Sequence, residues 1–251
     1  MKISHLGIMV LLFSASGGRG GGLTDMFRNW DPNWPQRFGI TGVGYAQQQN
    51  YGVGNAEIML GPINVPATAI GEIENEVTQF GVKADAWILP FWNVHAILGT
   101  IDGTTTVTPA LPGFPTVEVN YDGVVYGVGT TLAYGRDWWW ASVTGVITET
   151  DLDTGAASVM SWLVTPKVGV KGERFEAWIG ATYQNVDERQ KGTFDLGALG
   201  MATYDIELEA AHEWNAHLGL RYSVSDSIFL TLEGGFGNRE SVLWHVEWRF
   251  W

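Results

Sequence analysis

The chain has 251 residues, no cysteine and a formal net charge of −13. The lack of cysteine excludes disulfides and thiolate metal sites, and the acidity without any basic run argues against nucleic acid as a partner. Charged residues make up only 16% of the chain, against about 25% in a soluble domain, yet a mean hydropathy of +0.02 is too low for a bundle of membrane helices. Apolar residues must therefore be interleaved with polar ones, as in strands with one apolar face.

The first residues have the pattern of an export signal. Lys2 supplies a positive charge, residues 6–13 form an apolar run, and residues 14–16 are small. A run of this length is too short to span a bilayer as a helix, whereas it suits cleavage by a signal peptidase. We therefore predict a signal peptide at residues 1–16, with a buried N-terminal strand as the alternative.

The next segment, residues 17–37, has no strand pattern. Pro32 and Pro35 lie close to Trp30 and Trp34, and proline removes backbone donors and discourages regular structure. We predict an irregular periplasmic segment that either plugs a barrel mouth or rests against its rim. Residues 38–251 are predicted to form the barrel itself.

From Phe38 onward, apolar and polar residues alternate in segments broken by turns, and aromatic residues often stand at the ends of the apolar face. The alternation is clearest at residues 139–148, 175–184, 214–222 and 228–236. It is weaker at residues 38–48, 77–89, 92–102, 122–134 and 158–170. With the closing segment, this predicts ten strands, an even number that brings both chain ends back to the periplasm.

The connections fall into two classes that alternate along the chain. The tight turns are at residues 90–91, 135–137, 171–174 and 223–226, and the other joins are at residues 49–76, 103–121, 149–157, 186–213 and 237–241. Membrane barrels have short turns on one side and longer loops on the other, whereas a soluble β-sandwich has no reason to sort its loops in this way. Alternating residues within 117–121 and 204–209 predict either strand extensions above the membrane or two further strands, which leaves twelve as the alternative count.

The closing segment has the most complete apolar face of the chain. That face consists of Val242, Trp244, Val246, Trp248 and Phe250. Residues 242–251 resemble the signature of the bacterial outer-membrane protein family, a last strand of alternating hydrophobic residues that ends in an aromatic residue. Trp251 falls one place out of register with that face. The resemblance implies a transmembrane antiparallel β-barrel in the outer membrane, contact with outer-membrane lipids, and recognition of this strand by the barrel-insertion machinery. It does not identify a narrow family.

Charged and histidine side chains are predicted on the inward faces of these strands. They are Lys83, Asp85, His95, Lys167, Glu176, His217, Arg221, Glu233, His245, Glu247 and Arg249. A ten-stranded barrel is narrow, so charges inside it must be paired or hydrated. This pattern predicts a polar network that fills the lumen. A thin water-lined channel and a binding or catalytic site are the alternatives.

We predict no catalytic residue, metal ion or cofactor. Three histidine–carboxylate pairs were considered for general-base chemistry: His217 with Glu233, His245 with Glu247, and His212 beside Glu213. Polar neighbours on a lumen face form such pairs by default, and no Gly-x-Ser-x-Gly motif is present. Residues 151–155 have spacing similar to a calcium loop, but the later acidic ligand is missing.

The predicted function is a structural or porin-like outer-membrane barrel with limited passage of small polar solutes. Two other functions remain open at this point. One is an outer-membrane enzyme acting on lipid or peptide at the outer rim, and the other is a surface-binding protein acting through residues 49–76 and 186–213. No oligomeric state is predicted.

Overall fold

The computed structural model describes residues 34–60, 63–65, 70–110, 116–153, 158–195, 200–210 and 212–251. The chain divides into two units, Met1–Trp34 and Pro35–Trp251, and the second unit is described below. The predicted signal peptide, and the predicted irregular segment up to residue 33, lie outside the described residues. Among the described residues, no helix is long and apolar enough to cross a bilayer.

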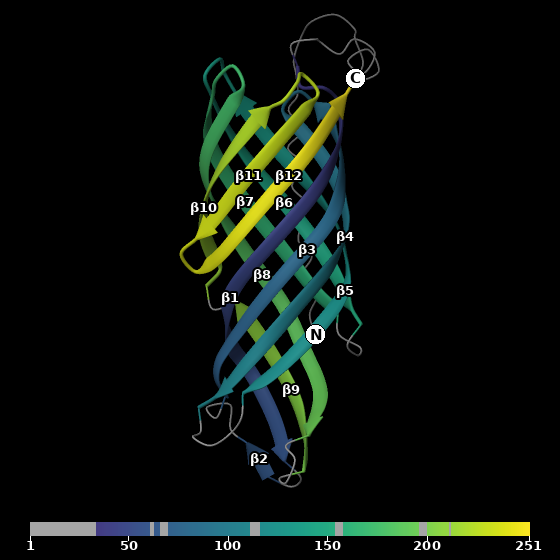
Figure 1. The fold of residues 1–251 in the computed structure, drawn as a ribbon, viewed down its shortest axis with the longest axis vertical. Helices are drawn as coiled ribbons and strands as arrows, with labels where there is room; N and C mark the ends of the chain where they lie inside the picture. Colours follow the sequence, from purple (N-terminus) through teal and green to yellow (C-terminus); the bar gives the residue numbers. More distant parts are fainter. Residues whose placement is uncertain are drawn as a thin grey trace, which may run out of the picture. The chain divides into compact units, whose positions relative to one another are not determined.

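Ten antiparallel strands pair in sequence and close into a ring (Figure 1). They are β1 (Phe38–Leu60), β3 (Ile70–Leu89), β4 (Trp92–Pro109), β5 (Val117–Gly135), β6 (Trp139–Leu152), β7 (Ser158–Lys171), β8 (Phe175–Asp195), β10 (Trp214–Ser223), β11 (Ile228–Phe236) and β12 (Arg239–Phe250). The ring closes between the first and last strands, where Phe38 pairs with Phe250 and Gln49 pairs with Arg239. The prediction of a ten-stranded antiparallel barrel is confirmed.

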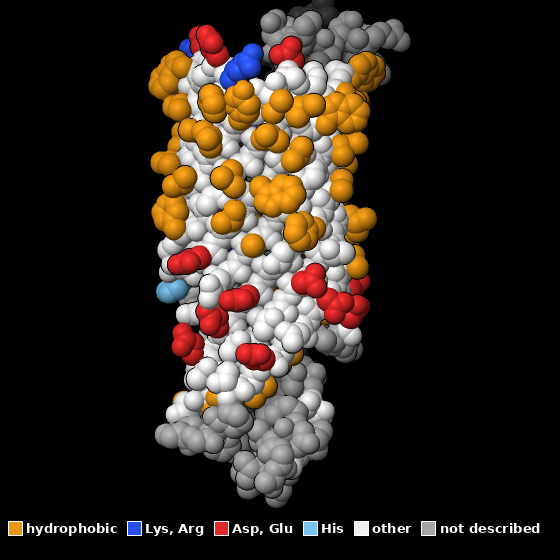
Figure 2. Space-filling model, in the orientation of Figure 1, with side chains coloured by type: hydrophobic (Ala, Val, Ile, Leu, Met, Phe, Trp, Pro, Cys, Tyr) orange, Lys and Arg blue, Asp and Glu red, His pale blue; other side chains and the backbone are white. Residues whose placement is uncertain are grey.

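Two-residue alternation gives each strand of the ring an outward apolar face. Exposed outward side chains include Val82, Leu98, Val128, Val143, Ile147, Val168, Ile179, Leu218, Leu232 and Val246. On the face drawn in Figure 2, hydrophobic side chains form a band across the barrel, and most of the acidic side chains in view lie beyond its lower edge. Because a closed ring satisfies every backbone hydrogen bond, such a band can face hydrocarbon. The structure is therefore that of a transmembrane barrel.

Aromatic side chains mark both edges of the band. Near one edge the rings of Phe175 and Tyr222 lie 4.8 Å apart, and near the other the rings of Tyr183 and Trp214 lie 5.3 Å apart. Each of these two ring pairs has one member on β8 and one on β10. On either strand the two aromatic residues are eight positions apart, which is roughly 26 Å along the strand, and a strand tilt of about 40° reduces this to roughly 20 Å along the barrel axis. That height is close to the apolar band of about 25 Å in membrane barrels.

Four tight turns lie at one end of the barrel, which we call the tight-turn end. They occupy residues 90–91, 136–138, 172–174 and 224–227, within one residue of the predicted positions. In the third turn Gly172 donates its backbone N–H to the carbonyl of Phe175. The first residue of β1 and the last residue of β12 lie at this same end, because Phe38 pairs with Phe250 and also with Ala86, close to the first tight turn.

The three long joins predicted at the opposite end are mostly strand: residues 117–121 are an extension of β5, residues 204–209 belong to a further strand, and the joins themselves are shorter than predicted. β1 and β8 continue far beyond the band, β2 (Ile63–Val65) pairs with the end of β1, and β9 (Met201–Ala210) pairs with both β8 and β1. Beyond the band, β9 lies between β8 and β1. Within the band that position is filled by β10, β11 and β12, which are only 10, 9 and 12 residues long. The sheet therefore has twelve strands in all, but the ring within the band has ten.

The closing strand has the two faces that its sequence predicts. Val242, Trp244, Val246 and Trp248 point outward, and between 42% and 53% of each residue is exposed. β12 ends at Phe250. Trp251 lies past the strand with a positive φ of 76°, and its ring stacks on Phe38 with centroids 5.8 Å apart.

Candidate functional site

The structure places all eleven predicted polar side chains inside the ring. Six of them line a cavity in the lumen: Lys83, His95, Lys167, His217, Glu233 and His245. The other five form ion pairs with one another and with Lys83 at the tight-turn end: Asp85, Glu176, Arg221, Glu247 and Arg249. The lumen therefore has a charged end and a hollow part.

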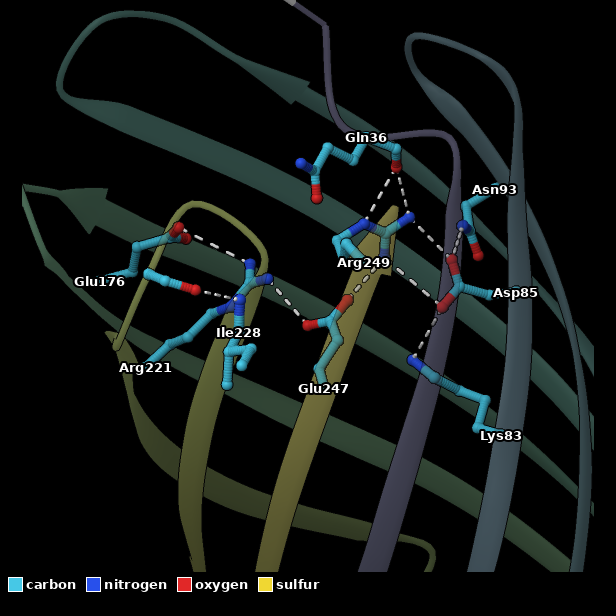
Figure 3. A network of polar contacts seen from close by, with 10 residues as sticks. Gln36, Lys83, Asp85, Asn93, Glu176, Arg221, Ile228, Glu247 and Arg249 are labelled. Atoms are coloured by element: carbon cyan, nitrogen blue, oxygen red, sulfur yellow. Dashed lines mark hydrogen bonds and ion pairs between the residues drawn. The ribbon is translucent and has the colours of Figure 1, made fainter. Parts of the chain in front are cut away.

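Asp85 is the centre of the charged end (Figure 3). Its side chain is only 1% exposed. It lies 3.0 Å from Nη2 of Arg249 and 3.9 Å from Nζ of Lys83, and the amide of Asn93 donates a hydrogen bond to it at 2.7 Å. One buried carboxylate therefore holds side chains from β3, β4 and β12 together.

The ion pairs continue along the wall from Arg249 to β8. Arg249 also contacts Glu247 at 2.5 Å, Glu247 lies 2.8 Å from Arg221, and Arg221 lies 3.7 Å from Glu176. Three cations and three carboxylates thus alternate, and we call these six residues the end network. Counted as whole residues, Arg249 and Asp85 are 8% and 7% exposed, so these two paired charges are buried within the lumen.

A second cluster lies against the cavity. Glu233 accepts hydrogen bonds from Lys167 at 2.5 Å and from Nε1 of Trp178 at 2.7 Å, and Nδ1 of His217 lies 3.3 Å from its other oxygen. The structure therefore brings together the predicted pair of His217 and Glu233. The carboxylate already holds a lysine and an indole, so this arrangement is that of a structural ion pair.

The remaining candidates for catalysis or metal binding are not assembled into a site. Glu247 is held by two arginines of the end network, and His212 and Glu213 are exposed at the start of β10. Of the loop with calcium-like spacing, residues 154–155 lie outside the described residues. Within the described part of the chain, no group of three or more histidine, aspartate or glutamate side chains could hold a metal ion.

Glycines make room for the large lumen side chains. A Cβ on Gly180 would lie 2.5 Å from Cε1 of His217 and 2.7 Å from the backbone oxygen of Pro166. His95 lies over Gly129 in the same way. The absence of a Cβ at these two glycines lets the imidazoles of His217 and His95 pack directly against the wall.

We expect Gly180→Ala to lower the free energy of unfolding by about 1–3 kcal/mol, because overpacking forces side chains or backbone to shift. Gly234→Ala is the matched control, since its added Cβ would meet nothing within 4 Å. Urea unfolding in lipid vesicles measures both variants. Equal stability of the two variants would contradict the packing argument.

The cavity has a volume of about 460 Å³, within the range of small-molecule pockets. Much of its wall is aliphatic and comes from six strands: Val43, Ile97, Val125, Val146, Leu163 and Leu243. Arg239 also lines it and was missed in the sequence. Arg239 lies in the same alternation as His245, Glu247 and Arg249, so the inward face of the last strand continues three residues earlier than its predicted start.

Comparisons with known proteins give a weak likeness in fold. No protein-family model matches the sequence, and no curated protein sequence matches it. Similar solved structures include the outer membrane protein OprG from Pseudomonas aeruginosa, with 10% identity, 86% of this chain and 98% of that chain covered, and a TM-score of 0.46. The translocator domain of the autotransporter NalP from Neisseria meningitidis is 8% identical, with 91% of this chain and 93% of that chain covered and a TM-score of 0.44. The transport unit of the autotransporter AIDA-I from Escherichia coli is 8% identical, with 91% of this chain and 97% of that chain covered and a TM-score of 0.43.

These likenesses carry no functional argument. The architecture rests on the chain's own features: ten paired strands, closure between β1 and β12, an outward apolar band, and turns that are tight at one end. It is the architecture of a bacterial outer-membrane β-barrel.

Proposed function

We propose that this protein is a narrow outer-membrane barrel that allows only limited passage of small solutes, with the end network as the restriction. The observation that carries the proposal is the burial of Asp85 and Arg249 inside the lumen at the tight-turn end. A solute crossing the barrel must displace these paired charges. Breaking buried ion pairs is costly, so passage through the closed arrangement is slow.

The orientation follows the usual arrangement of bacterial barrels, in which the short turns face the periplasm. The end network then closes the periplasmic side, and the cavity opens toward the outside of the cell. In this proposal the outward face of β12 contacts outer-membrane lipids, and the same strand is recognised by the insertion machinery. No observation on the described residues favours the enzyme or the surface-binding alternative, and the segments proposed for surface binding are largely β-strand.

We expect the wild-type barrel to give a small conductance in planar bilayers and Arg221→Ala to raise it severalfold. Arg221 is the link between Glu247 and Glu176, so its removal opens the side of the network next to β8. Arg174→Ala, in an exposed tight turn, is the control and should leave the conductance unchanged. The steady current of the purified, folded proteins is the measurement.

Two results would contradict the proposal. A wild-type barrel with a large, constant conductance has no restriction, and a barrel that gives no current either as the wild type or as Arg221→Ala has no passage. Folding is checked on the same samples by comparing the gel migration of unheated and boiled protein.

A further inference from the structure

One charge in the lumen lies outside the network of ion pairs. Among the residues that the structure describes, the lumen holds four carboxylates, of Asp85, Glu176, Glu233 and Glu247, and each of them contacts a cation other than Arg239. Arg239 is only 6% exposed, and its Nε has no hydrogen-bond partner in the structure. Among the described side chains, none forms an ion pair with it. An arginine side chain in a protein is a cation, and a buried charge without a partner is costly.

The backbone of Arg239 is held firmly in place. Nδ2 of Asn215 donates to the carbonyl of Arg239 at 2.8 Å, and the N–H of Arg239 donates to Oδ1 of Asn215 at 3.0 Å. Asn215 is itself buried. These two hydrogen bonds between β10 and the first residue of β12 fix the backbone position of Arg239. The cation is therefore positioned before any ligand binds.

A second unused donor lies beside Arg239. Gln49 pairs directly with Arg239 across β1 and β12. It is 6% exposed, and its Nε2 has no hydrogen-bond partner in the structure. Two neighbouring inward residues therefore offer N–H donors without acceptors, and a buried donor normally has an acceptor.

The cavity next to Arg239 suits an anion with an apolar body. Its charged lining consists of three cations and one carboxylate, Lys83, Lys167, Arg239 and Glu233, although the whole chain carries a net charge of −13. Its aliphatic wall provides the apolar contact that ligand pockets use for most of their area. An acidic protein therefore holds a cationic, partly apolar cavity in its lumen.

We propose that this cavity binds a small organic carboxylate with an apolar body, and that Arg239 binds the carboxylate group. The inference deepens the proposed function and rests on it for passage, because it names the class of solute that the lumen would accept. Binding itself needs only the cavity and does not require the end network to open.

The test is an isothermal calorimetric titration of the folded, full-length barrel, held in lipid nanodiscs, with sodium benzoate. Benzamide and benzylammonium are the matched neutral and cationic probes, and acetate lacks the apolar body. We expect benzoate to bind at least about tenfold more tightly than the other three, because hydrogen bonds to a charged acceptor are the stronger ones and 1.4 kcal/mol corresponds to tenfold in affinity.

Arg239→Gln should weaken benzoate binding at least about tenfold and remove the preference over benzamide. Arg239→Lys should keep the preference, and Arg136→Gln, which removes an exposed turn arginine, should bind as the wild type does. If Arg239→Gln fails to fold, the comparison of four probes on the wild type and on Arg239→Lys still decides. Equal binding of benzoate and benzamide, or no benzoate binding at all, overturns the site.

The two proposals fail in different ways. If the barrel binds benzoate but never conducts, the binding site stands and the proposed passage is wrong. If it conducts without any preference for benzoate, the passage stands and the proposed binding site is wrong.

Discussion

Asp85→Ala is expected to lower the free energy of unfolding by about 3–5 kcal/mol, the cost of removing one partner from a buried ion pair. The carboxylate is held by Arg249, Lys83 and Asn93. Without it, Arg249 keeps only Glu247 as an ionic partner, and Lys83 loses its partner in the end network. Two cations, Lys83 and Arg249, then lie close together without the carboxylate that both of them contact. Urea unfolding in lipid vesicles, followed by tryptophan fluorescence, measures the loss.

Two controls separate charge from other effects. Asp226→Ala removes an exposed carboxylate from a tight turn at the same end, and surface substitutions of this kind change stability by about 0.5 kcal/mol or less. Asp85→Asn keeps the shape and a hydrogen-bonding oxygen, so its loss should be smaller than that of Asp85→Ala. If Asp85→Ala were as stable as Asp226→Ala, the end network would not hold the strands together.

The ring of ten strands could be predicted because lipid and lumen impose opposite preferences on neighbouring residues. Within the band this contrast is sharp, as in β12, where Trp244, Val246 and Trp248 face outward between charged inward neighbours. The tight turns were predictable for the same reason, since they mark where the alternation stops. Both signals come from local sequence and need no knowledge of strand partners.

Beyond the band the contrast weakens, and the prediction there found strand only within residues 117–121 and 204–209. The middle of β1 reads Gln47, Gln48, Gln49 and Asn50, which is polar on both faces although the strand continues to Leu60. Water on the outside removes the need for apolar side chains, so a long strand and a polar loop have the same composition. The alternation at residues 204–209 was visible, but the pairing of β9 with both β8 and β1 depends on how early β10, β11 and β12 end.

The candidate site shows the same division. That polar residues such as Asp85 and Arg249 face the lumen follows from alternation alone. That they meet across 164 positions of sequence follows from the closure of the ring between β1 and β12 and from the register of the strands. Arg239 could not be singled out from the local sequence. Its lack of an ionic partner becomes visible only when the structure shows that the lumen carboxylates contact other cations.

Val246→Arg is expected to lower the free energy of unfolding by about 2–4 kcal/mol, the cost of an arginine facing lipid near the middle of the bilayer. Val246 is the central outward residue of β12 and is 46% exposed. Its neighbours across the sheet are Gly42 and Leu230, and neither offers a carboxylate to a new arginine. Glu240→Arg is the matched control, because Glu240 is an exposed residue of the same strand beyond the band and the cost falls to about 0–1 kcal/mol near the interface.

Reversible unfolding from phosphatidylcholine vesicles compares the two variants. A difference between them places the outward face of β12 in hydrocarbon, whereas equal and small effects would mean that this face meets water or protein and that the band has another partner.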